Sequence, residues 1–423
     1  MKHFDYPRIR ESYDETVLPN GLRIRVVYKP EFDKLYAMLA VNYGSMDLKY
    51  FDGSQSINTP AGVAHYLEHK MFDIPDGNVM QRFSALGGSP NAFTGYGMTA
   101  YYVQTTQNPE ENLRLLLEMF FTPYFTEESV EKERGIIAQE IKMYADSPDS
   151  RLFELLFEKA LPGHPLSVPI AGSVESIRDI SAQTLLQCYE AFYRPENMIL
   201  CVEGNLSPER VEKIAESVEL HQSARAIHMM PEIPATEPPE LGLHRVSMDV
   251  SMPMFAAGFR IPDISYGDDR TEIVADLTME LLCGESTTLY QRLYEQGLID
   301  SGFSSGYEGV RNIAMLSASG DSDEPETVLR EICLEAEIIR KTGIDPLDLE
   351  RVKKAMIGRR IRDLDSFAGT CSRLCDSFFD GTDCFGFPET VASVTEADIL
   401  NLMQYISEDR MTLVVIAPKE AMK

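Results

Sequence analysis

The second half of the chain echoes the first half, and this constrains the fold more than any other feature of the sequence. The segment ILCVEGNLSPE, which starts at Ile199, is matched about 210 residues later by MTLVVIAPKEA, which starts at Met411. The strands and helices expected before each segment also follow a similar order. We therefore expect an α+β fold in which one unit occurs twice, as two homologous domains that each pack helices against a mostly antiparallel sheet.

A proline-rich stretch lies between the two halves. The segment HMMPEIPATEPPELGLH contains four prolines between positions 231 and 239, a composition typical of an extended connector. We predict an N-terminal domain over residues 1–225, a linker over 226–243 and a C-terminal domain over 244–423. With 423 residues, 44% of them hydrophobic, the chain is long enough for both domains to have a buried core.

The charge of the chain excludes some classes of partner. Lys and Arg total 39 and Asp and Glu total 67, which gives a formal net charge of -28. Such a chain is repelled by nucleic-acid phosphates and anionic lipid, so we expect neither nucleic acid nor membrane as a partner. The N-terminal residues contain no apolar core of a secretory signal, and no apolar run approaches the roughly 20 residues of a membrane span. The sequence therefore predicts a cytoplasmic protein.

Local patterns predict the elements of the N-terminal half. Alternating apolar residues after a Pro-Asn-Gly turn indicate a strand over 22–26, and a glycine-punctuated segment over 87–106 indicates two strands joined by a turn. Helices are predicted over 109–123, which starts with proline and acidic residues, and over 126–146, where Thr126 is the expected cap.

One short stretch carries a metal-binding pattern. In TPAGVAHYLEHKMF, which begins at Thr59, that threonine is the expected cap of a helix over 61–72. On a helix, His65, Glu68 and His69 occupy positions i, i+3 and i+4 and share one face. Two imidazoles at i and i+4 can bind one zinc ion, and the carboxylate beside the second can reach the zinc-bound water. This is the His-x-x-Glu-His pattern of the inverted zincins.

A third zinc ligand must come from elsewhere in the chain, because catalytic zinc usually has three protein ligands and a water. The predicted helix VEKERGIIAQEIKMY offers Glu131, Glu133 and Glu140. Glu133 and Glu140 are seven residues apart and share a helix face. These physical considerations alone do not choose among the three glutamates.

Several segments together resemble a known family. They are LPNGLRIRVV, HYLEH, GGSPNAFT with the following TAYYV, ERGIIAQEI, GHPLSVPIAG, YRPENMIL and GNLSPE. The chain resembles the pitrilysin and insulinase family of zinc peptidases, in its mitochondrial-processing-peptidase-like branch, over most of its length. This resemblance implies the LuxS/MPP-like metallohydrolase fold with one zinc ion per chain.

The resemblance also implies a role for each residue that matches the family motifs. His65, His69 and Glu140 become the zinc ligands. Glu68 becomes the general base that activates the water, and Glu133 becomes a supporting catalytic carboxylate on the same helix as Glu140. The chemistry agrees, because zinc lowers the pKa of a bound water and polarises the scissile carbonyl while a glutamate accepts the proton.

The family resemblance extends to substrates. Asn91, Ala92 and Phe93 match the edge strand on which a peptide is bound as an added strand. The family implies short or unfolded peptide substrates, which enter a chamber enclosed by a pair of chains. We therefore expect a zinc metalloendopeptidase. The alternative is a non-proteolytic peptide-binding or assembly subunit with the same fold.

One departure from the family concerns the C-terminal half. In STTLYQRLYEQGLIDSGF, Thr288 stands where the family has a substrate-holding arginine, and Asp300 stands near the position of a tyrosine. The same departure occurs in members that work as heterodimers with a metal-free paralogue. We therefore expect the chain to be the catalytic subunit of a dimer with a homologous paralogue, or else with a second copy of itself.

Overall fold

The structure is a computed structural model that describes residues 1–75, 77–120, 123–218, 237–262, 264 and 268–419. The chain divides into two compact units that are each built from three stretches of sequence. Unit 1 comprises Met1–Lys142, Val168–Ile233 and Ile361–Phe385, and unit 2 comprises Met143–Ser167, Pro234–Arg360 and Gly386–Lys423. Within the predicted linker, residues 226–236 lie outside the described residues.

Unit 1 contains a seven-stranded sheet in the order β1-β2-β3-β11-β4-β10-β9. The strands are β1 (Lys2–Tyr6), β2 (Glu11–Val17), β3 (Arg23–Tyr28), β4 (Leu35–Val41), β9 (Gly88–Thr94), β10 (Thr99–Thr105) and β11 (Met198–Gly204). Neighbouring strands are antiparallel except for β3 and β11, which are parallel. The strand over 22–26 and the strand pair within 87–106 are thus confirmed.

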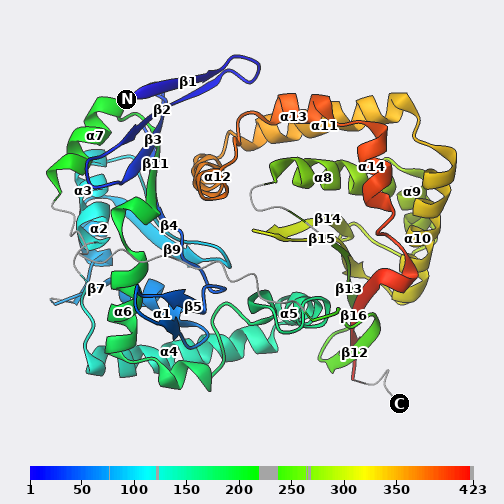
Figure 1. The fold of residues 1–423 in the computed structure, drawn as a ribbon, viewed down its shortest axis with the longest axis horizontal. Coiled ribbons are helices and arrows are strands. Elements are labelled where there is room, and N and C mark those ends of the chain that lie inside the picture. The colour runs from blue at the N-terminus through cyan, green and yellow to red at the C-terminus, as the bar shows by residue number, and fades with distance from the viewer. Residues whose placement is uncertain (76, 121–122, 219–236, 263, 265–267, 420–423) are drawn as a thin grey trace. The chain divides into compact units, whose positions relative to one another are not determined.

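Helices cover both faces of this sheet, which explains why its central strands β4 and β11 are buried along their whole length. The helices of unit 1 are α1 (Val63–Lys70), α2 (Met80–Ala85), α3 (Pro109–Phe120), most of α4 (Glu127–Asp146), α6 (Ala182–Phe192), α7 (Pro208–Ser217) and α12 (Phe367–Asp380). Figure 1 shows α3 and α7 on one face and α12 on the other. Helix α12 comes from the C-terminal half of the sequence and packs on β11 and β4.

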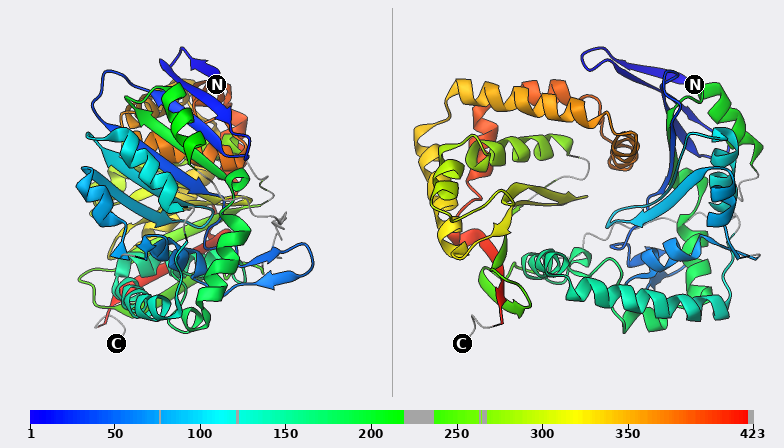
Figure 2. Two further views of the ribbon diagram at one scale, coloured as in Figure 1. Left: turned by 90° about the vertical axis from the view of Figure 1, so that its left-hand side faces the viewer. Right: turned by 180° about the vertical axis from the view of Figure 1, so that it is seen from behind.

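Unit 2 contains a five-stranded sheet in the order β12-β16-β13-β15-β14. The strands are β12 (Gly242–Met248), β13 (Met254–Ile261), β14 (Ser304–Val310), β15 (Ile313–Asp321) and β16 (Met411–Pro418). The helices are α5 (Pro148–Ala160), α8 (Asp269–Cys283), α9 (Thr288–Glu295), α10 (Pro325–Thr342), most of α11 (Pro346–Asp363), α13 (Phe387–Ser393) and α14 (Glu396–Met403). Helix α5, from the N-terminal half of the sequence, lies on β13 and β16, whereas α8 and α10 lie on the opposite face (Figures 1 and 2).

The two sheets share one topology. The order β3-β11-β4-β10-β9 in unit 1 corresponds strand by strand to β12-β16-β13-β15-β14 in unit 2, and in each set only the first pair is parallel. The two segments that look alike in the sequence become β11 and β16, which occupy equivalent places. The predicted duplicated α+β fold is therefore confirmed.

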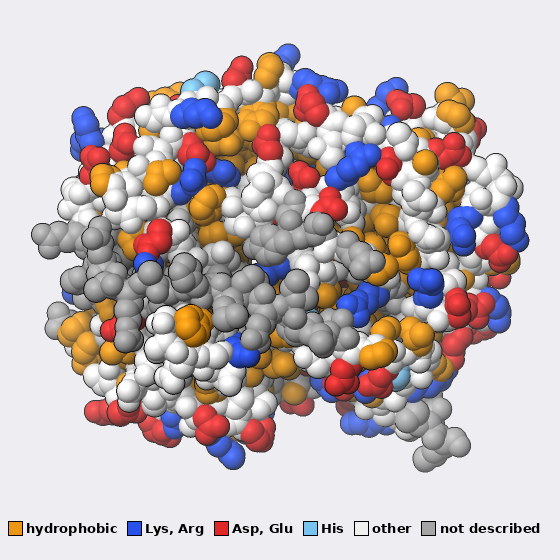
Figure 3. Space-filling model, in the orientation of Figure 1, with side chains coloured by type: hydrophobic (Ala, Val, Ile, Leu, Met, Phe, Trp, Pro, Cys, Tyr) orange, Lys and Arg blue, Asp and Glu red, His pale blue; other side chains and the backbone are white. Residues whose placement is uncertain are grey.

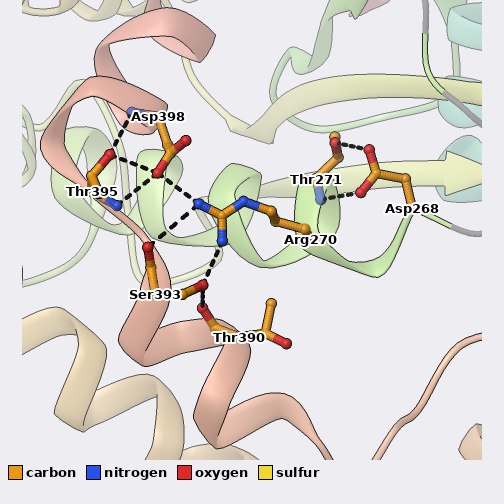
Figure 4. A network of polar contacts seen from close by, with 7 residues as sticks. All are labelled: Asp268, Arg270, Thr271, Thr390, Ser393, Thr395 and Asp398. Carbon is orange, nitrogen blue, oxygen red and sulfur yellow. Dashed lines mark hydrogen bonds and ion pairs between the residues drawn. The ribbon is translucent and has the colours of Figure 1, made fainter.

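Local hydrogen bonds define where helices begin. In unit 1 the Thr126 hydroxyl accepts the Ser129 N–H at 3.2 Å, so the predicted cap of α4 is present. In unit 2 the Thr395 hydroxyl accepts the Asp398 N–H at 3.3 Å at the start of α14. The guanidinium of Arg270, on α8, donates to the Asp398 carboxylate at 2.8 Å and so ties α8 to α14 (Figure 4).

Charged side chains of both signs occur on the face of the molecule that Figure 3 shows. In the space-filling view of Figure 3, acidic and basic side chains are interspersed over the visible face, with apolar side chains between them. Among the helices that the structure describes, none combines the length and the apolar character needed to cross a membrane.

Candidate metal centre

Helix α1 carries the His-x-x-Glu-His motif and is shorter than predicted. It spans Val63–Lys70 and is capped by Gly62, which has φ +90°, so the prediction that Thr59 caps a helix over 61–72 is wrong. The reason is a tertiary contact with a distant loop, which the local sequence pattern does not reveal. A Cβ at Gly62 would lie 2.4 Å from the carbonyl oxygen of Ala171, so the loop at that residue contacts the start of α1 directly. Only glycine combines this close approach with a positive φ.

Two histidines and one glutamate converge in unit 1. His65 and His69 lie on α1 and Glu140 lies on α4, and one ligand atom from each residue lies within 4.8 Å of the other two. The Nε2 atom of His65 is 3.5 Å from Glu140 Oε1, and the Nε2 atom of His69 is 3.3 Å from Glu140 Oε2. This is the only such cluster of His, Cys, Asp or Glu among the described residues.

The sequence of α4 explains why it presents its glutamates to α1. Val130 and Ile137 are the buried residues of this helix, and their spacing forms a stripe that also includes Glu133 and Glu140. The Tyr66 hydroxyl donates to the Val130 carbonyl and joins α1 to α4. Packing of the apolar stripe therefore places both carboxylates beside the histidines.

Glu133 contacts a histidine rather than joining the ligand cluster. Its Oε1 atom lies 2.9 Å from Nδ1 of His69. A carboxylate on Nδ1 favours the tautomer with a proton there, which leaves Nε2 unprotonated and available to a metal. The three glutamates thus differ in position: Glu140 lies in the cluster, Glu133 contacts His69 Nδ1, and Glu131 is exposed and pairs with Arg134.

The electrostatics of the cluster favour a cation. Burial acts to lower the pKa of His69, but the hydrogen bond to Glu133 and the charges of Glu68 and Glu140 outweigh it, so this pKa is raised above its usual value. The hydrogen bond with His69 lowers the pKa of Glu133. Three carboxylates around two imidazoles thus give a site with an excess of negative charge, which a divalent ion would neutralise.

Glu68 lies on the same helix face and is not in the ligand cluster. Its Oε2 atom accepts a hydrogen bond from the Thr94 hydroxyl at 2.7 Å, and the carboxylate is partly exposed. The sequence analysis missed Thr94. Strand alternation could have indicated it, because Ala92 and Thr94 are two residues apart on β9 and must share a face.

The residues expected to bind peptide lie on the edge strand of unit 1. Among the strands that the structure describes, β9 pairs with β10 alone, so Asn91, Ala92 and Phe93 lie on an edge strand of the sheet. The Ala92 N–H donates to the Asn91 side-chain oxygen at 2.9 Å. In unit 2, Thr288 is exposed at the start of α9, and the Asp300 carboxylate accepts the Gly302 N–H at 2.7 Å.

The donor set fits zinc. Imidazole nitrogen and carboxylate oxygen are both common zinc ligands, and two histidines with one acidic residue form a three-ligand catalytic set. All three residues hold their ligand atoms close together before any metal is considered, and the Nδ1 partner of His69 is in place. The His65 Nδ1 atom is buried and has no hydrogen-bond partner among the described residues.

A helix with the His-x-x-Glu-His motif is typical of the inverted zincin peptidases. Comparison with protein families agrees with this class. Residues 29–174 match the family described as insulinase (peptidase family M16), and residues 179–356 match the family's second domain, described as the peptidase M16 inactive domain. The chain belongs to the insulinase family of peptidases, M16.

Relatives over the full length support this membership. An uncharacterised zinc protease, YmfH of Bacillus subtilis, is 34% identical over 99% of this chain and 100% of its own length. A crystal structure described as that of an M16-like peptidase from Alicyclobacillus acidocaldarius has 30% identity and a TM-score of 0.91, over 97% of this chain and 99% of that chain. Pitrilysin shares the fold with a TM-score of 0.77 and 20% identity, and 98% of this chain matches 46% of pitrilysin.

Proposed function

We propose that this protein is a zinc-dependent endopeptidase that hydrolyses short or unfolded peptides, with one zinc ion held by His65, His69 and Glu140. The observation that carries the proposal is the convergence of these three ligand atoms beside a separate carboxylate, Glu68, on the same helix face. The family and the printed names of the relatives as zinc proteases support it.

The chain's own residues have distinct tasks in this proposal. Zinc, when bound, would lower the pKa of a water and polarise the scissile carbonyl. Glu68 accepts the proton of that water and can pass it to the leaving amine. Glu133 keeps Nε2 of His69 directed at the metal through its contact with Nδ1. None of these groups has to move far, because each is already held by a neighbouring side chain.

We propose that peptides bind along the edge of β9 that has no partner strand among the described residues. A peptide in extended conformation can pair with an exposed strand edge and gain main-chain hydrogen bonds. Asn91, Ala92 and Phe93 offer this edge, and a peptide carbonyl could replace the Asn91 side chain that now accepts the Ala92 N–H. Such binding requires an extended substrate, which accounts for the proposed preference for short or unfolded peptides.

We further propose that the chain works as the catalytic subunit of a dimer, with a homologous paralogue or a second copy. The support is the chemistry of the second unit. Thr288 and Asp300 offer no cation or phenol to hold a peptide where the family has an arginine and a tyrosine. A partner chain would supply those contacts.

Hydrolysis of a mixed pool of short unstructured peptides, with bound zinc counted, tests the proposed function. We expect one zinc per chain and cleavage that is lost after chelation and restored by added zinc. Zinc binding with no cleavage by the purified chain alone would favour the heterodimer, and the assay is then repeated with co-expressed paralogues. A chain that binds zinc and cleaves nothing in either case would favour the non-proteolytic peptide-binding subunit.

Substitution of each of the three glutamates of α4 is expected to affect zinc binding to a different extent. Glu140→Gln removes a ligand and should weaken zinc binding more than about 100-fold, whereas Glu133→Gln should weaken it roughly 10- to 100-fold by freeing the His69 ring. Glu131→Gln is the matched control on the same helix, because that side chain is exposed and contacts neither histidine in the described structure. Competition with a chelator of known affinity measures all three, and equal affinity in Glu140→Gln and Glu131→Gln would contradict the ligand assignment.

A further inference from the structure

The hydrogen bond between Thr94 and Glu68 joins the two functional elements of the site. Thr94 is the last residue of β9, the proposed peptide-binding strand, and Glu68 lies on the helix that carries both histidines. The hydroxyl of Thr94 donates to Glu68 Oε2 at 2.7 Å. We infer that Thr94 is a positioning residue for the general base, an inference that rests on the proposed function. With Oε2 held by the hydroxyl, Oε1 is the oxygen that accepts the proton.

A glutamate needs such a partner to act as an efficient base. Its side chain has three rotatable bonds, and the carboxylate of Glu68 is partly exposed, so packing alone does not fix its orientation. A hydroxyl that donates to a carboxylate forms a short, charge-assisted hydrogen bond, stronger than one between neutral groups. Proton abstraction depends on hydrogen-bond reach and orientation, so a freely rotating carboxylate would spend less time in a productive geometry.

Thr94 is itself held in place by the hairpin that it enters. Across the turn between β9 and β10, Thr94 pairs with Thr99, and the Gly95 N–H donates to the Met98 carbonyl at 2.8 Å. The turn is anchored to the segment after β4, because the Ser45 N–H donates to the Gly95 carbonyl at 3.0 Å.

Close packing at this anchor adds rigidity. A Cβ at Gly44 would lie 2.2 Å from the Tyr96 carbonyl oxygen, so the backbone after β4 lies directly against the turn. The Thr99 hydroxyl also donates to the Tyr43 carbonyl at 2.9 Å in the buried core. The position of Thr94 is therefore fixed by the sheet and by the contacts of the turn. A residue that orients another side chain must itself have such a fixed position.

Strand β9 would thus position both the bound peptide and the carboxylate of Glu68. A peptide paired with β9 takes its register from the backbone near Ala92, and the side chain two residues along the same strand holds Glu68. Loss of the Thr94 hydroxyl should therefore slow the chemical step without weakening peptide binding or zinc binding. A purely structural role for Thr94 would instead lower stability or disturb the strand edge, and would affect peptide affinity.

Two substitutions at position 94 separate these roles. Thr94→Val keeps the shape and the strand propensity and removes the hydroxyl, whereas Thr94→Ser keeps the hydroxyl. On the zinc-loaded enzyme, with its partner chain if one is required for activity, Thr94→Val is expected to lower kcat by about 10- to 100-fold with KM unchanged. Thr94→Ser is expected to retain most of kcat. Zinc affinity, and peptide affinity measured in the Glu68→Gln background, should be the same with threonine or valine at this position.

The control is Thr105→Val, which removes a hydroxyl at the far end of the same pair of strands, where Thr105 pairs with Gly88. That hydroxyl donates to the Gln107 carbonyl at 2.6 Å rather than to Glu68, so the variant should lower the unfolding temperature and leave kcat unchanged. The inference is overturned if Thr94→Val keeps the wild-type kcat, if Thr94→Ser is as impaired as Thr94→Val, or if Thr94→Val weakens zinc binding in parallel with activity. A wild-type enzyme without Glu68-dependent cleavage would overturn the proposed function itself, which is a different result.

Discussion

Glu68→Gln is expected to bind zinc as the wild type does and to lose about 10²- to 10⁴-fold in kcat. Glutamine has nearly the same shape, and its amide oxygen can still accept the Thr94 hydroxyl, but it cannot take a proton at neutral pH. The proposed zinc ligands are His65, His69 and Glu140, none of which is changed, so the affinity for zinc should stay the same. Zinc content and single-turnover cleavage of one identified peptide, measured on the same preparation, check both parts.

A second variant tests whether turnover can be lost without the loss of zinc. His65→Ala removes a ligand and should lose both zinc and turnover, whereas Glu131→Gln, on the neighbouring helix, should lose neither. Substantial peptidase activity in Glu68→Gln would contradict the assignment of the base. Loss of zinc from Glu68→Gln would instead mean that this carboxylate belongs to the ligand set.

The sequence predicts more of this site than of its surroundings, for a physical reason. The positions of His65, Glu68 and His69 on one face follow from helix geometry, which is local. Helix geometry places Glu133 and Glu140 on a common face but does not tell them apart, because the decision depends on how α4 packs on α1; at the sequence level only the family resemblance separates their roles. The start of α1 was predicted incorrectly for the same reason, since Gly62 is selected by a loop more than 100 residues away in the sequence.

In the fold, too, local sequence patterns predict the elements but not the contacts between elements that lie far apart in the sequence. The duplication is visible in the sequence because equivalent strands carry similar apolar runs, and the structure confirms it as two sheets of one topology. Strand and helix patterns do not reveal that α5 packs on β13 and β16, or that α12 packs on β11 and β4. Each of these helices lies far in the sequence from the strands it covers, and amphipathic periodicity reports which face is buried but not against what.

The packing of α12 creates a buried carboxyl group that the sequence analysis did not identify. Glu203, on β11, is 1% exposed, and its Oε2 atom has no hydrogen-bond partner among the described residues. Burial raises its pKa to about 8. The charge of Glu11 acts in the same direction, whereas nearby Lys29 and a hydrogen bond from Thr370 of α12 oppose it.

This group should make the protein less stable as the pH rises from about 4.5 to about 8. In that window the folded protein holds a proton on Glu203 that the unfolded chain has already lost, so the free energy of unfolding decreases with pH. The contribution is present in full below the unfolded pKa and is lost as the pH passes through the folded pKa. Each pKa unit corresponds to about 1.4 kcal/mol, so the loss approaches roughly 5 kcal/mol above pH 8.

Glu203→Gln is expected to remove this part of the pH dependence, because a glutamine does not titrate. Urea unfolding gives the free energy of unfolding of the wild type and the variant at pH 5.5, 7 and 8.5. The test is whether the difference between these two free energies changes with pH. A constant offset from replacing the carboxyl by an amide therefore does not interfere. Glu216→Gln, at an exposed position on α7 of the same unit, is the control and should run parallel to the wild type. If Glu203→Gln also runs parallel to the wild type, ionisation of the buried carboxyl is not what lowers the free energy of unfolding as the pH rises.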